Sequence, residues 1–456
     1  MRVRILPGSD LAGPLSVPGD KSIAHRWLIL AATARGRSRI AGLPPSLDVR
    51  STAACLAQLS PEARPGLDAW LRDDAVAAEG NGSTWNIRSD HGASPTLEVE
   101  SEGRDALVEA SSDLDCGNSG SAMRLLAGLV AAAPFRTVLT GDESLSSRPM
   151  ERVAEPLRKM MARVATTNGH APIAVEGARL RGIRFATPVP TAQVKSAVLL
   201  AGLAAEGETT VVEAAATRDH TERALAALGA PVRVEHGSVT VERFQHAGFD
   251  ATVPGDVSSA AFVVAAAVLT RSALAIERVG LNPTRTRFLD VVERMGVPVK
   301  RRIQEEVLGE PVGVLTIGMP DALRGTRIGP DELPLVIDEV PILAVLGAFA
   351  TGETSFLGAG ELRTKESDRL ARLAEGLRGL GGRAADEGED LVVAGGGLAG
   401  GRADGVGDHR LAMAFAVAAL GAGRPSEIDG MESAAVSFPG FLETLRQQGA
   451  SVEVVG

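Results

Sequence analysis

Six stretches of the chain repeat the same order of hydrophobic and polar positions. Each begins with polar residues, continues as an apolar, Ala-rich segment of helical length, passes a Gly, and ends in a β-rich run. The stretches start near residues 20, 118, 191, 256, 338 and 408. Self-similarity at long spacing indicates an internal repeat.

A second helical pattern follows in each unit and leads into another strand. It is clearest in "ALAALGAPVRVEH", "VVERMGVPVKRR" and "FLETLRQQGASVEVV", where Gly or a small residue ends the helix. The first helix is apolar nearly all round, which predicts burial, whereas the charged face of the second predicts an outer position. The pattern therefore predicts an α/β (α+β) protein of six strand–helix–strand–helix–strand units, with helices inside and sheets outside.

The motif "VPGD" occurs twice, at Val17–Asp20 and Val253–Asp256, directly before the first and fourth apolar helices. If three units form a domain, the chain passes between domains near Gly19 and again near Gly255. This predicts one domain of residues 1–19 and 255–456 and another of residues 20–254, joined by two hinge strands. A P-loop is disfavoured, because Asp20 stands where that motif needs Gly before Lys.

Composition narrows the class of function. The 456 residues carry a net charge of −10, with 3% aromatic side chains and no tyrosine, so we expect no nucleic-acid partner. The longest apolar runs are about half of the ~20 residues that a membrane span needs, and "MRVRILPGSD" lacks a signal-peptide core. Two cysteines argue against a disulfide framework and a zinc site. We therefore expect a cytosolic globular protein without a membrane partner.

Cationic and small polar residues gather where the buried helices are predicted to begin. A helix start offers free N–H groups and a partial positive charge, which suit a phosphate or a carboxylate. If these ends converge, they form a cationic pocket that contains a few acids. The residues at these starts and in the adjoining loops include Lys21, Ser22, Arg26, Asp48, Asn118, Gly120, Arg124, Arg148, Thr191, Gln193, Lys195, Arg218, Arg285, Asp338, Lys365, Glu366, Arg369, Asp408 and Arg410.

Single motifs in this set allow simpler interpretations. "KESDRL" fits a solvated helix start with i,i+3 ion pairs, and "GDHRLAM" fits an Asp N-cap beside a surface arginine. We expect Cys116 to be a packed thiol, since no histidine stands near it in the sequence. Asp338 is different, because it enters the apolar run "LVIDEVPILAVLGAF", where a carboxylate is usually paired or takes part in chemistry.

As a set, the motifs resemble the 5-enolpyruvylshikimate-3-phosphate synthase family. The match runs in order from about Ser16 to Phe441, and such an ordered series is specific although each motif alone is weak. The motifs are "PGDKSIAHR", "LDCGNSGSAMRLLAG", "GDESLSSRPM", "AQVKSAVLLAGL", "TRDHTE", "NPTRT", "IDEVPILAV", "KESDRL", "DHRLAM" and "SFPGF".

The resemblance implies a two-domain enolpyruvyl transferase fold, in which each domain has three βαβαββ units with buried parallel helices and outer sheets, an inside-out α/β barrel. It implies an enzyme that transfers the enolpyruvyl group of phosphoenolpyruvate to the 5-hydroxyl of shikimate 3-phosphate and releases phosphate. This is the sixth step of the shikimate pathway, toward chorismate and the aromatic amino acids. The family needs no cofactor or metal, so we expect none, and we expect a monomer that glyphosate inhibits.

The resemblance also assigns roles residue by residue. Asp338 and Glu366 match the acid/base pair, and Lys21, the third catalytic residue, reaches both substrates and assists the proton transfers. The positions that match the shikimate 3-phosphate site are Lys21, Ser22, Arg26, Thr191, Ala192, Gln193, Arg218, Asp338 and Lys365. The positions that match the phosphoenolpyruvate site are Lys21, Gly120, Arg148, Gln193, Arg369 and Arg410.

The chain departs from the family pattern at several positions. Thr191 and Ala192 stand where many members have two serines, so one hydroxyl contact to the phosphate is missing. Val436 replaces a lysine that some members carry, and Glu361 replaces an asparagine. These choices resemble a branch that includes glyphosate-tolerant enzymes, whose tolerance is associated with alanine at the position of Gly120. Because this chain keeps glycine there, we expect glyphosate to compete with phosphoenolpyruvate.

Two alternative functions fit part of the pattern. The UDP-N-acetylglucosamine enolpyruvyl transferases share the fold and the donor, but "KESDRL", "DHRLAM" and "TRDHTE" disfavour them, and Cys116 lies in a different motif from their loop cysteine. A non-catalytic anion-binding protein on the same scaffold would not need Asp338, Glu366 and Lys21 together.

Overall fold

Six helices that are apolar nearly all round lie at the centres of the molecule. The computed structural model describes residues 1–8, 11, 15–73 and 96–455. All of α10 is buried except its last residue, Leu269, as its uninterrupted apolar sequence requires. The predicted burial of six helices is confirmed for α1 (Lys21–Ala32), α5 (Gly120–Val130), α8 (Ala192–Gly202), α10 (Val257–Leu269), α13 (Val340–Phe349) and α15 (His409–Gly421).

An outer helix follows each buried helix. In chain order, each outer helix lies between two strands of its unit. In the first unit, a further helix, α3 (Arg64–Arg72), follows the outer helix. The amphipathic sequence of α11 buries only Phe288, Leu289, Val291 and Val292. The six outer helices are α2 (Leu47–Leu59), α7 (Glu151–Lys159), α9 (His220–Ala227), α11 (Arg287–Arg294), α14 (Arg369–Gly379) and α16 (Phe441–Gln447).

The second to fifth units end in two strands, so the single final strand expected from the pattern is incomplete for these four, whereas the sixth unit ends in one strand, Val452–Val454. The second unit shows the full order β4 (Leu114–Asp115), α5, β5 (Arg136–Thr140), α7, β6 (Arg163–Thr167) and β7 (His170–Glu176). The turn between β6 and β7 is Asn168-Gly169, and both residues have positive φ. Asn-Gly is the favoured pair for such a hairpin turn, so this strand pair was readable from the sequence.

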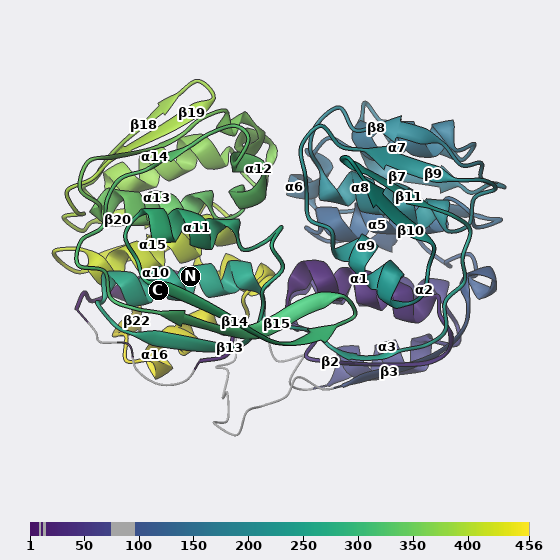
Figure 1. Ribbon diagram of the computed structural model, residues 1–456, viewed down its shortest axis with the longest axis horizontal. Helices are drawn as coiled ribbons and strands as arrows, with labels where there is room; N and C mark the ends of the chain where they lie inside the picture. Colours follow the sequence, from purple (N-terminus) through teal and green to yellow (C-terminus); the bar gives the residue numbers. More distant parts are fainter. Residues whose placement is uncertain (9–10, 12–14, 74–95, 456) are drawn as a thin grey trace.

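Two hydrophobic cores divide the chain. One core draws its residues from Ile23 to Val253, and the other from Val3 to Val17 and from Val257 to Val452. β1 (Val3–Ile5) pairs with β21 (Ser426–Asp429) and β22 (Val452–Val454), which joins the chain start to the second core. Figure 1 shows the two halves side by side, each with sheets around its helices. The cores support the division predicted near residues 19 and 255, which stays a prediction.

The two "VPGD" segments lie against each other where the chain passes between the halves. Gly19 and Gly255 form an antiparallel bridge. The N–H of Asp20 donates to the carbonyl of Pro254 at 2.7 Å, and the N–H of Asp256 donates to the carbonyl of Pro18 at 2.7 Å. A Cβ on Gly19 would collide with the carbonyl oxygen of Gly42, so only glycine fits this crossing.

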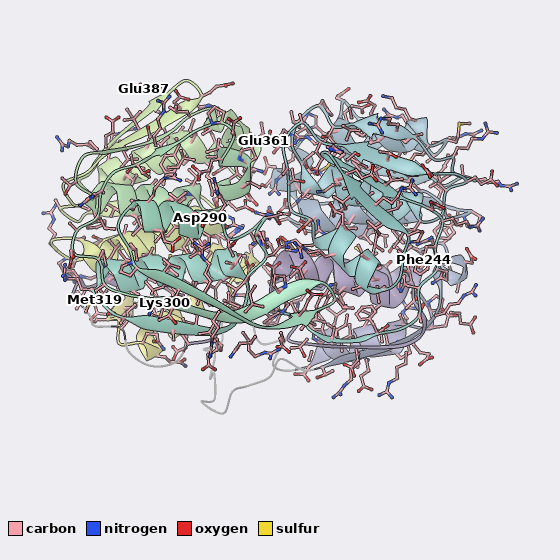
Figure 2. The ribbon with its side chains drawn as sticks, viewed as in Figure 1. Phe244, Asp290, Lys300, Met319, Glu361 and Glu387 are labelled. Atoms are coloured by element: carbon pink, nitrogen blue, oxygen red, sulfur yellow. The ribbon has the colours of Figure 1, made fainter. Side chains whose placement is uncertain are left out.

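Over the described ranges, no helix is long and apolar enough to cross a membrane. Side chains of both halves project into the region between them, and Glu361 lies at its edge (Figure 2).

Candidate active site

A cavity of about 420 Å³ lies between the two halves at the N-terminal ends of the buried helices. Lys21, Gly120, Ala192 and His409 are the first residues of α1, α5, α8 and α15, and all four line it. The expected convergence of helix starts is therefore observed. The other predicted site residues that line the cavity are Ser22, Arg148, Thr191, Gln193, Arg218, Asp338, Lys365, Glu366 and Arg410.

Lys21 and Ser22 enter the cavity from the start of α1. The side chain of Asp20 accepts the N–H of Ile23 at 2.9 Å and so caps this helix. Nζ of Lys21 lies 2.8 Å from Oδ2 of Asp48, and Oγ of Ser22 is 3.5 Å from Nη1 of Arg218. This end of the cavity therefore brings together a hydroxyl and two cations, the groups that commonly bind a phosphate.

Asp338 is surrounded by arginines from both halves. Arg218 forms a short ion pair with its carboxylate, and Nη2 of Arg410 lies 3.4 Å from Oδ2 of Asp338. Nη1 of Arg369 is 3.9 Å from Oδ1. Burial raises the pKa of Asp338, but the nearby Arg218, Arg410, Lys365 and Arg369 outweigh burial and hold this pKa well below its usual range. Asp338 is therefore an anion in the empty cavity.

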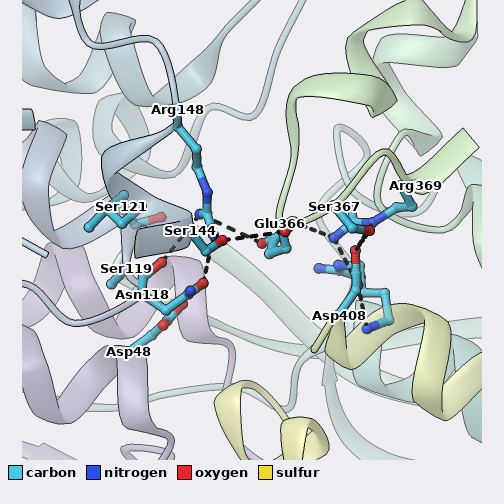
Figure 3. Close-up of polar contacts among 12 residues, drawn as sticks. Asp48, Asn118, Ser119, Ser121, Ser144, Arg148, Glu366, Ser367, Arg369 and Asp408 are labelled. Carbon is cyan, nitrogen blue, oxygen red and sulfur yellow. Dashed lines mark hydrogen bonds and ion pairs between the residues drawn. The ribbon is translucent and has the colours of Figure 1, made fainter. Parts of the chain in front are cut away.

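Glu366 lies between Arg369 of its own half and Arg148 of the opposite half. Its Oε2 accepts from Nη2 of Arg369 at 2.5 Å, and its Oε1 lies 4.0 Å from Nη1 of Arg148 (Figure 3). Oγ of Ser144 donates to the main-chain carbonyl of Glu366 at 3.3 Å, a second contact between the halves. Burial raises the pKa of Glu366, but the charges of Arg369, His409, Arg148 and Lys21 outweigh it, and the pKa lies well below its usual range.

Arg124 is a cavity residue that the motif comparison did not assign, although its place on the first turn of a buried helix marked it as cationic. Its Nη1 donates to Oε1 of Gln193 at 2.5 Å, and its Nη2 donates to the carbonyl of Pro149 at 3.1 Å. Burial, Arg152 and Arg148 lower the pKa of Arg124 to about 9. A Cβ on Gly120 would lie 2.8 Å from Nη1 of Arg124, so Gly120 leaves room for this guanidinium.

Arg26 and Arg369 do not line the cavity. Arg26 is buried and donates to Oγ1 of Thr221 and Oγ of Ser196, both at 2.8 Å. Nε of Arg369 donates to Oδ2 of Asp408 at 2.8 Å, which also caps α15. These two arginines stand behind the wall of the cavity and hold residues that line it. Their assigned substrate contacts stay predictions.

The structure adds cavity residues to the predicted set and settles the packing of one thiol. Arg152 and His409 also line the cavity, as does Arg285, which the sequence placed in the cationic pocket, and Arg152 forms an ion pair with Glu361 across the cavity at 3.0 Å. Cys116 is fully buried, as expected for a packed thiol, and the neighbouring Cys55 raises its pKa. In the described ranges, no group of three or more His, Cys, Asp or Glu residues is arranged to hold a metal ion.

Comparisons with solved structures identify the fold. The enolpyruvyl transferase NikO from Streptomyces tendae superposes with a TM-score of 0.74 at 20% identity, covering 99% of this chain and 98% of that one. A crystal structure of EPSP synthase from Acinetobacter baumannii superposes with a TM-score of 0.83 at 36% identity, and each chain is covered completely. The protein therefore has the two-domain enolpyruvyl transferase fold.

The sequence comparisons give the family. The family model of EPSP synthase (3-phosphoshikimate 1-carboxyvinyltransferase) matches residues 5–73 and 85–445. A 3-phosphoshikimate 1-carboxyvinyltransferase from Halorhodospira halophila is 46% identical over 99% of this chain and 97% of its own length. One from Acidithiobacillus ferrooxidans is 44% identical over 99% of both chains. The chain belongs to the EPSP synthase family.

Proposed function

We propose that the protein transfers the enolpyruvyl group of phosphoenolpyruvate to the 5-hydroxyl of shikimate 3-phosphate and releases phosphate. The observation that carries this function is the position of two carboxylates, Asp338 and Glu366, between arginines of both halves. The reaction joins two anions through two proton transfers, so it needs separate cationic sites with proton-transfer groups between them. The cavity offers both.

Shikimate 3-phosphate binds beside α1 and α8. Ser22, Thr191, Gln193 and Arg218 line this part of the cavity and provide hydroxyl, amide and guanidinium donors. The phosphate replaces Asp338 as the partner of Arg218, which leaves the Asp338 carboxylate free to face the ring hydroxyls together with Lys365. Ala192 offers only its backbone N–H, as the sequence pattern implies.

Phosphoenolpyruvate binds at the start of α5. Gly120 lets the donor approach the helix N-terminus, and Arg148 and Arg410 supply charge from opposite halves. Lys21 and Gln193 lie between the two substrate sites. Arg124 fixes the amide oxygen of Gln193, so the Gln193 side chain keeps one orientation. Both halves therefore supply residues that bind phosphoenolpyruvate.

The acid and the base differ in the protonation state that each needs. Asp338 accepts the 5-hydroxyl proton and is already an anion in the empty cavity. Glu366 delivers a proton to the methylene carbon as the 5-oxygen bonds to C2, so it must gain that proton after substrates bind. It then takes a proton back from the new methyl group as the bond from C2 to the phosphate oxygen breaks, which restores the double bond and releases phosphate. The anionic groups of phosphoenolpyruvate compensate the charges of Arg148 and Arg369, which raises the pKa of Glu366. Each transfer contributes on the order of 10²–10⁴ in rate.

A phosphate-release assay separates this function from its alternatives. The protein is supplied with phosphoenolpyruvate and either shikimate 3-phosphate, UDP-N-acetylglucosamine or no acceptor. We expect phosphate release only in the arm that contains shikimate 3-phosphate as the acceptor. Release with the UDP-sugar would assign the protein to the related transferase, and binding of the substrates without release in any arm would make it an anion-binding protein.

The same proposal includes a monomeric cytosolic enzyme without a cofactor. Both sides of the cavity come from one chain, which supports the monomer. Equilibrium sedimentation at assay concentration measures this state, and a dimer would contradict it.

A further inference from the structure

One hairpin reaches from its own half to the other. It consists of β14 (Val299–Val307) and β15 (Glu310–Ile317), and its strands are longer than those of the β6–β7 hairpin. Val307 and Leu308, at its tip, pack against the hydrophobic core of the opposite half. Figure 1 shows the hairpin extending beneath the gap toward α1 and β2 (Arg35–Ala41). This hairpin is therefore a strap beside the two hinge strands.

Glu310 begins β15 at the tip of this strap and is buried together with His220 at the start of α9. Oε1 of Glu310 lies 2.7 Å from Nδ1 of His220, and both side chains are at most 2% exposed. Oε2 of Glu310 accepts from Nδ2 of Asn282 at 2.9 Å. Nη1 of Arg223 donates to the carbonyl of Gly309 at 2.9 Å. The tip is thus bonded to α9 through both its side chain and its backbone.

The same contacts hold the residue between His220 and Arg218. Nδ2 of Asn282 also donates to Oδ1 of Asp219 at 2.7 Å, and Oγ1 of Thr284 donates to that oxygen at 3.1 Å. Asp219 and His220 are therefore both fixed by groups from the half that carries the strap. Arg218 directly precedes them and faces Ser22 and Asp338 in the cavity.

We propose that Glu310 is a positioning residue for Arg218, and that it acts through His220 and Asn282 to hold the loop that binds the substrate phosphate. The inference rests on the proposed function, because the phosphate belongs to shikimate 3-phosphate. Glu310 touches neither substrate. It links the strap to the binding loop, so the orientation of Arg218 depends on a residue of the other half.

The charges around the pair favour a bound proton. Burial raises the pKa of Glu310 to about 7, and Asp219 and Asp20 add to the shift, although the hydrogen bond from Asn282 and the charge of Arg223 oppose it. Burial lowers the pKa of His220, which also faces Asp20, Arg285, Arg26 and Asp219. Near neutral pH the Glu310 carboxyl can therefore donate to Nδ1 of a neutral His220 while its other oxygen accepts from Asn282.

The first experiment measures kinetics in two variants and a control. Glu310→Ala removes both bonds, and we expect the KM for shikimate 3-phosphate to rise about tenfold, the size of effect expected from the loss of one or two hydrogen bonds between uncharged groups. The KM for phosphoenolpyruvate should change less than about twofold. Glu310→Gln can donate to His220 and accept from Asn282, so it should restore the KM. Glu306→Ala, at an exposed site of the same hairpin, is the control and should behave as wild type.

Three results would overturn the proposal: an unchanged KM for shikimate 3-phosphate in folded Glu310→Ala, an equal loss for both substrates, or a Gln variant as impaired as the Ala variant. If Glu310→Ala does not fold, the pH dependence of Glu310→Gln decides the question. The glutamine mimics the protonated carboxyl and does not titrate.

The second experiment is calorimetric binding of shikimate 3-phosphate to wild type and Glu310→Gln from pH 6 to pH 8. Taking the ratio of the two dissociation constants cancels the ionisation of the substrate phosphate. We expect the affinity of wild type for shikimate 3-phosphate to fall relative to that of the variant as pH rises through about 7. The reason is that Glu310 then becomes a buried anion. A constant ratio would overturn the proposal.

Failure of the proposed function would look different. If the proposed function is wrong, the wild type itself releases no phosphate from phosphoenolpyruvate and shikimate 3-phosphate, whereas an error about Glu310 would leave wild-type binding and turnover intact and the variants indistinguishable from it.

Discussion

At the scale of single residues, the cavity is organised by charge compensation. Asp338 and Glu366 are each stabilised as anions by arginines that the proposed reaction assigns to substrates. The carboxylates of the cavity therefore compensate its arginines, and in the proposed reaction each substrate anion replaces one of these carboxylates. This exchange links binding to the protonation of the acid and the base.

Replacement of Asp338 by Ala should separate binding from turnover. Arg218 loses its internal partner and stays available for the phosphate, so shikimate 3-phosphate should still bind. The rate should fall by a factor on the order of 10² or more, because the acceptor of the 5-hydroxyl proton is gone. Calorimetry and steady-state kinetics measure the two effects, with the exposed Asp321→Ala as a matched control. Near-normal turnover would remove Asp338 from the mechanism.

Gly120→Ala should weaken inhibition by glyphosate. The added Cβ would lie 2.8 Å from Nη1 of Arg124 and 3.5 Å from Nη1 of Arg148. The Arg124 guanidinium must shift, whereas the Arg148 guanidinium is at an ordinary contact distance, and the space beside the helix start becomes smaller. Inhibition constants against phosphoenolpyruvate should rise in the variant, while Gly329→Ala, whose added carbon meets no atom within 4 Å, should leave them unchanged. Wild type that resists millimolar glyphosate would contradict the expectation.

Residue types and motifs located most of the site, because helix starts converge whenever buried helices run parallel. They did not reveal which arginines touch solvent. Arg26 and Arg369 carry the right chemistry but are buried behind the wall, whereas Arg152, which no motif singled out, lines the cavity. Exposure depends on side-chain packing between elements far apart in the chain, which a single sequence does not encode as a pattern.

At the scale of elements, close helix packing fixes the ends that bind substrates. Gly128 of α5 lies against α8, and a Cβ there would come within 2.7 Å of the Cα of Ala197. The backbones of the two helices therefore touch. Because α5 and α8 begin at Gly120 and Ala192, their contact sets the distance between the two proposed substrate sites.

Gly128→Ala should destabilise the protein by about 1–3 kcal/mol, the usual result of adding a methylene-sized group to a packed core. The free energy of unfolding is measured in urea, with Gly329→Ala as the control that adds the same group in open space. A variant as stable as wild type would show that α5 and α8 can separate without loss.

At the scale of the whole molecule, the repeat could be predicted from the sequence, but the contacts between the two halves could not. Apolar helices and the residues at their ends identified the units, whose buried helices begin within two residues of the predicted starts. The pair Arg152 and Glu361 joins residues 209 positions apart. No local pattern predicts it, because its partners meet only once both halves have folded.

Closure about Gly19 and Gly255 should accompany binding. Lys21 and Arg148 belong to one half and Glu366 and Arg410 to the other, so substrates that bridge them should draw the halves together. Small-angle scattering should report a smaller radius of gyration after addition of shikimate 3-phosphate with glyphosate. No compaction would count against the hinge.

The central claim is that this cavity joins two specific substrates, and the structure of the product tests it most directly. The protein is incubated with shikimate 3-phosphate and phosphoenolpyruvate labelled with ¹³C at C2, and the mixture is followed by NMR. The account predicts a labelled enol ether bonded to the 5-oxygen of shikimate 3-phosphate, together with an equal amount of free phosphate. Unchanged phosphoenolpyruvate, or phosphate with labelled pyruvate and no ether, would contradict it.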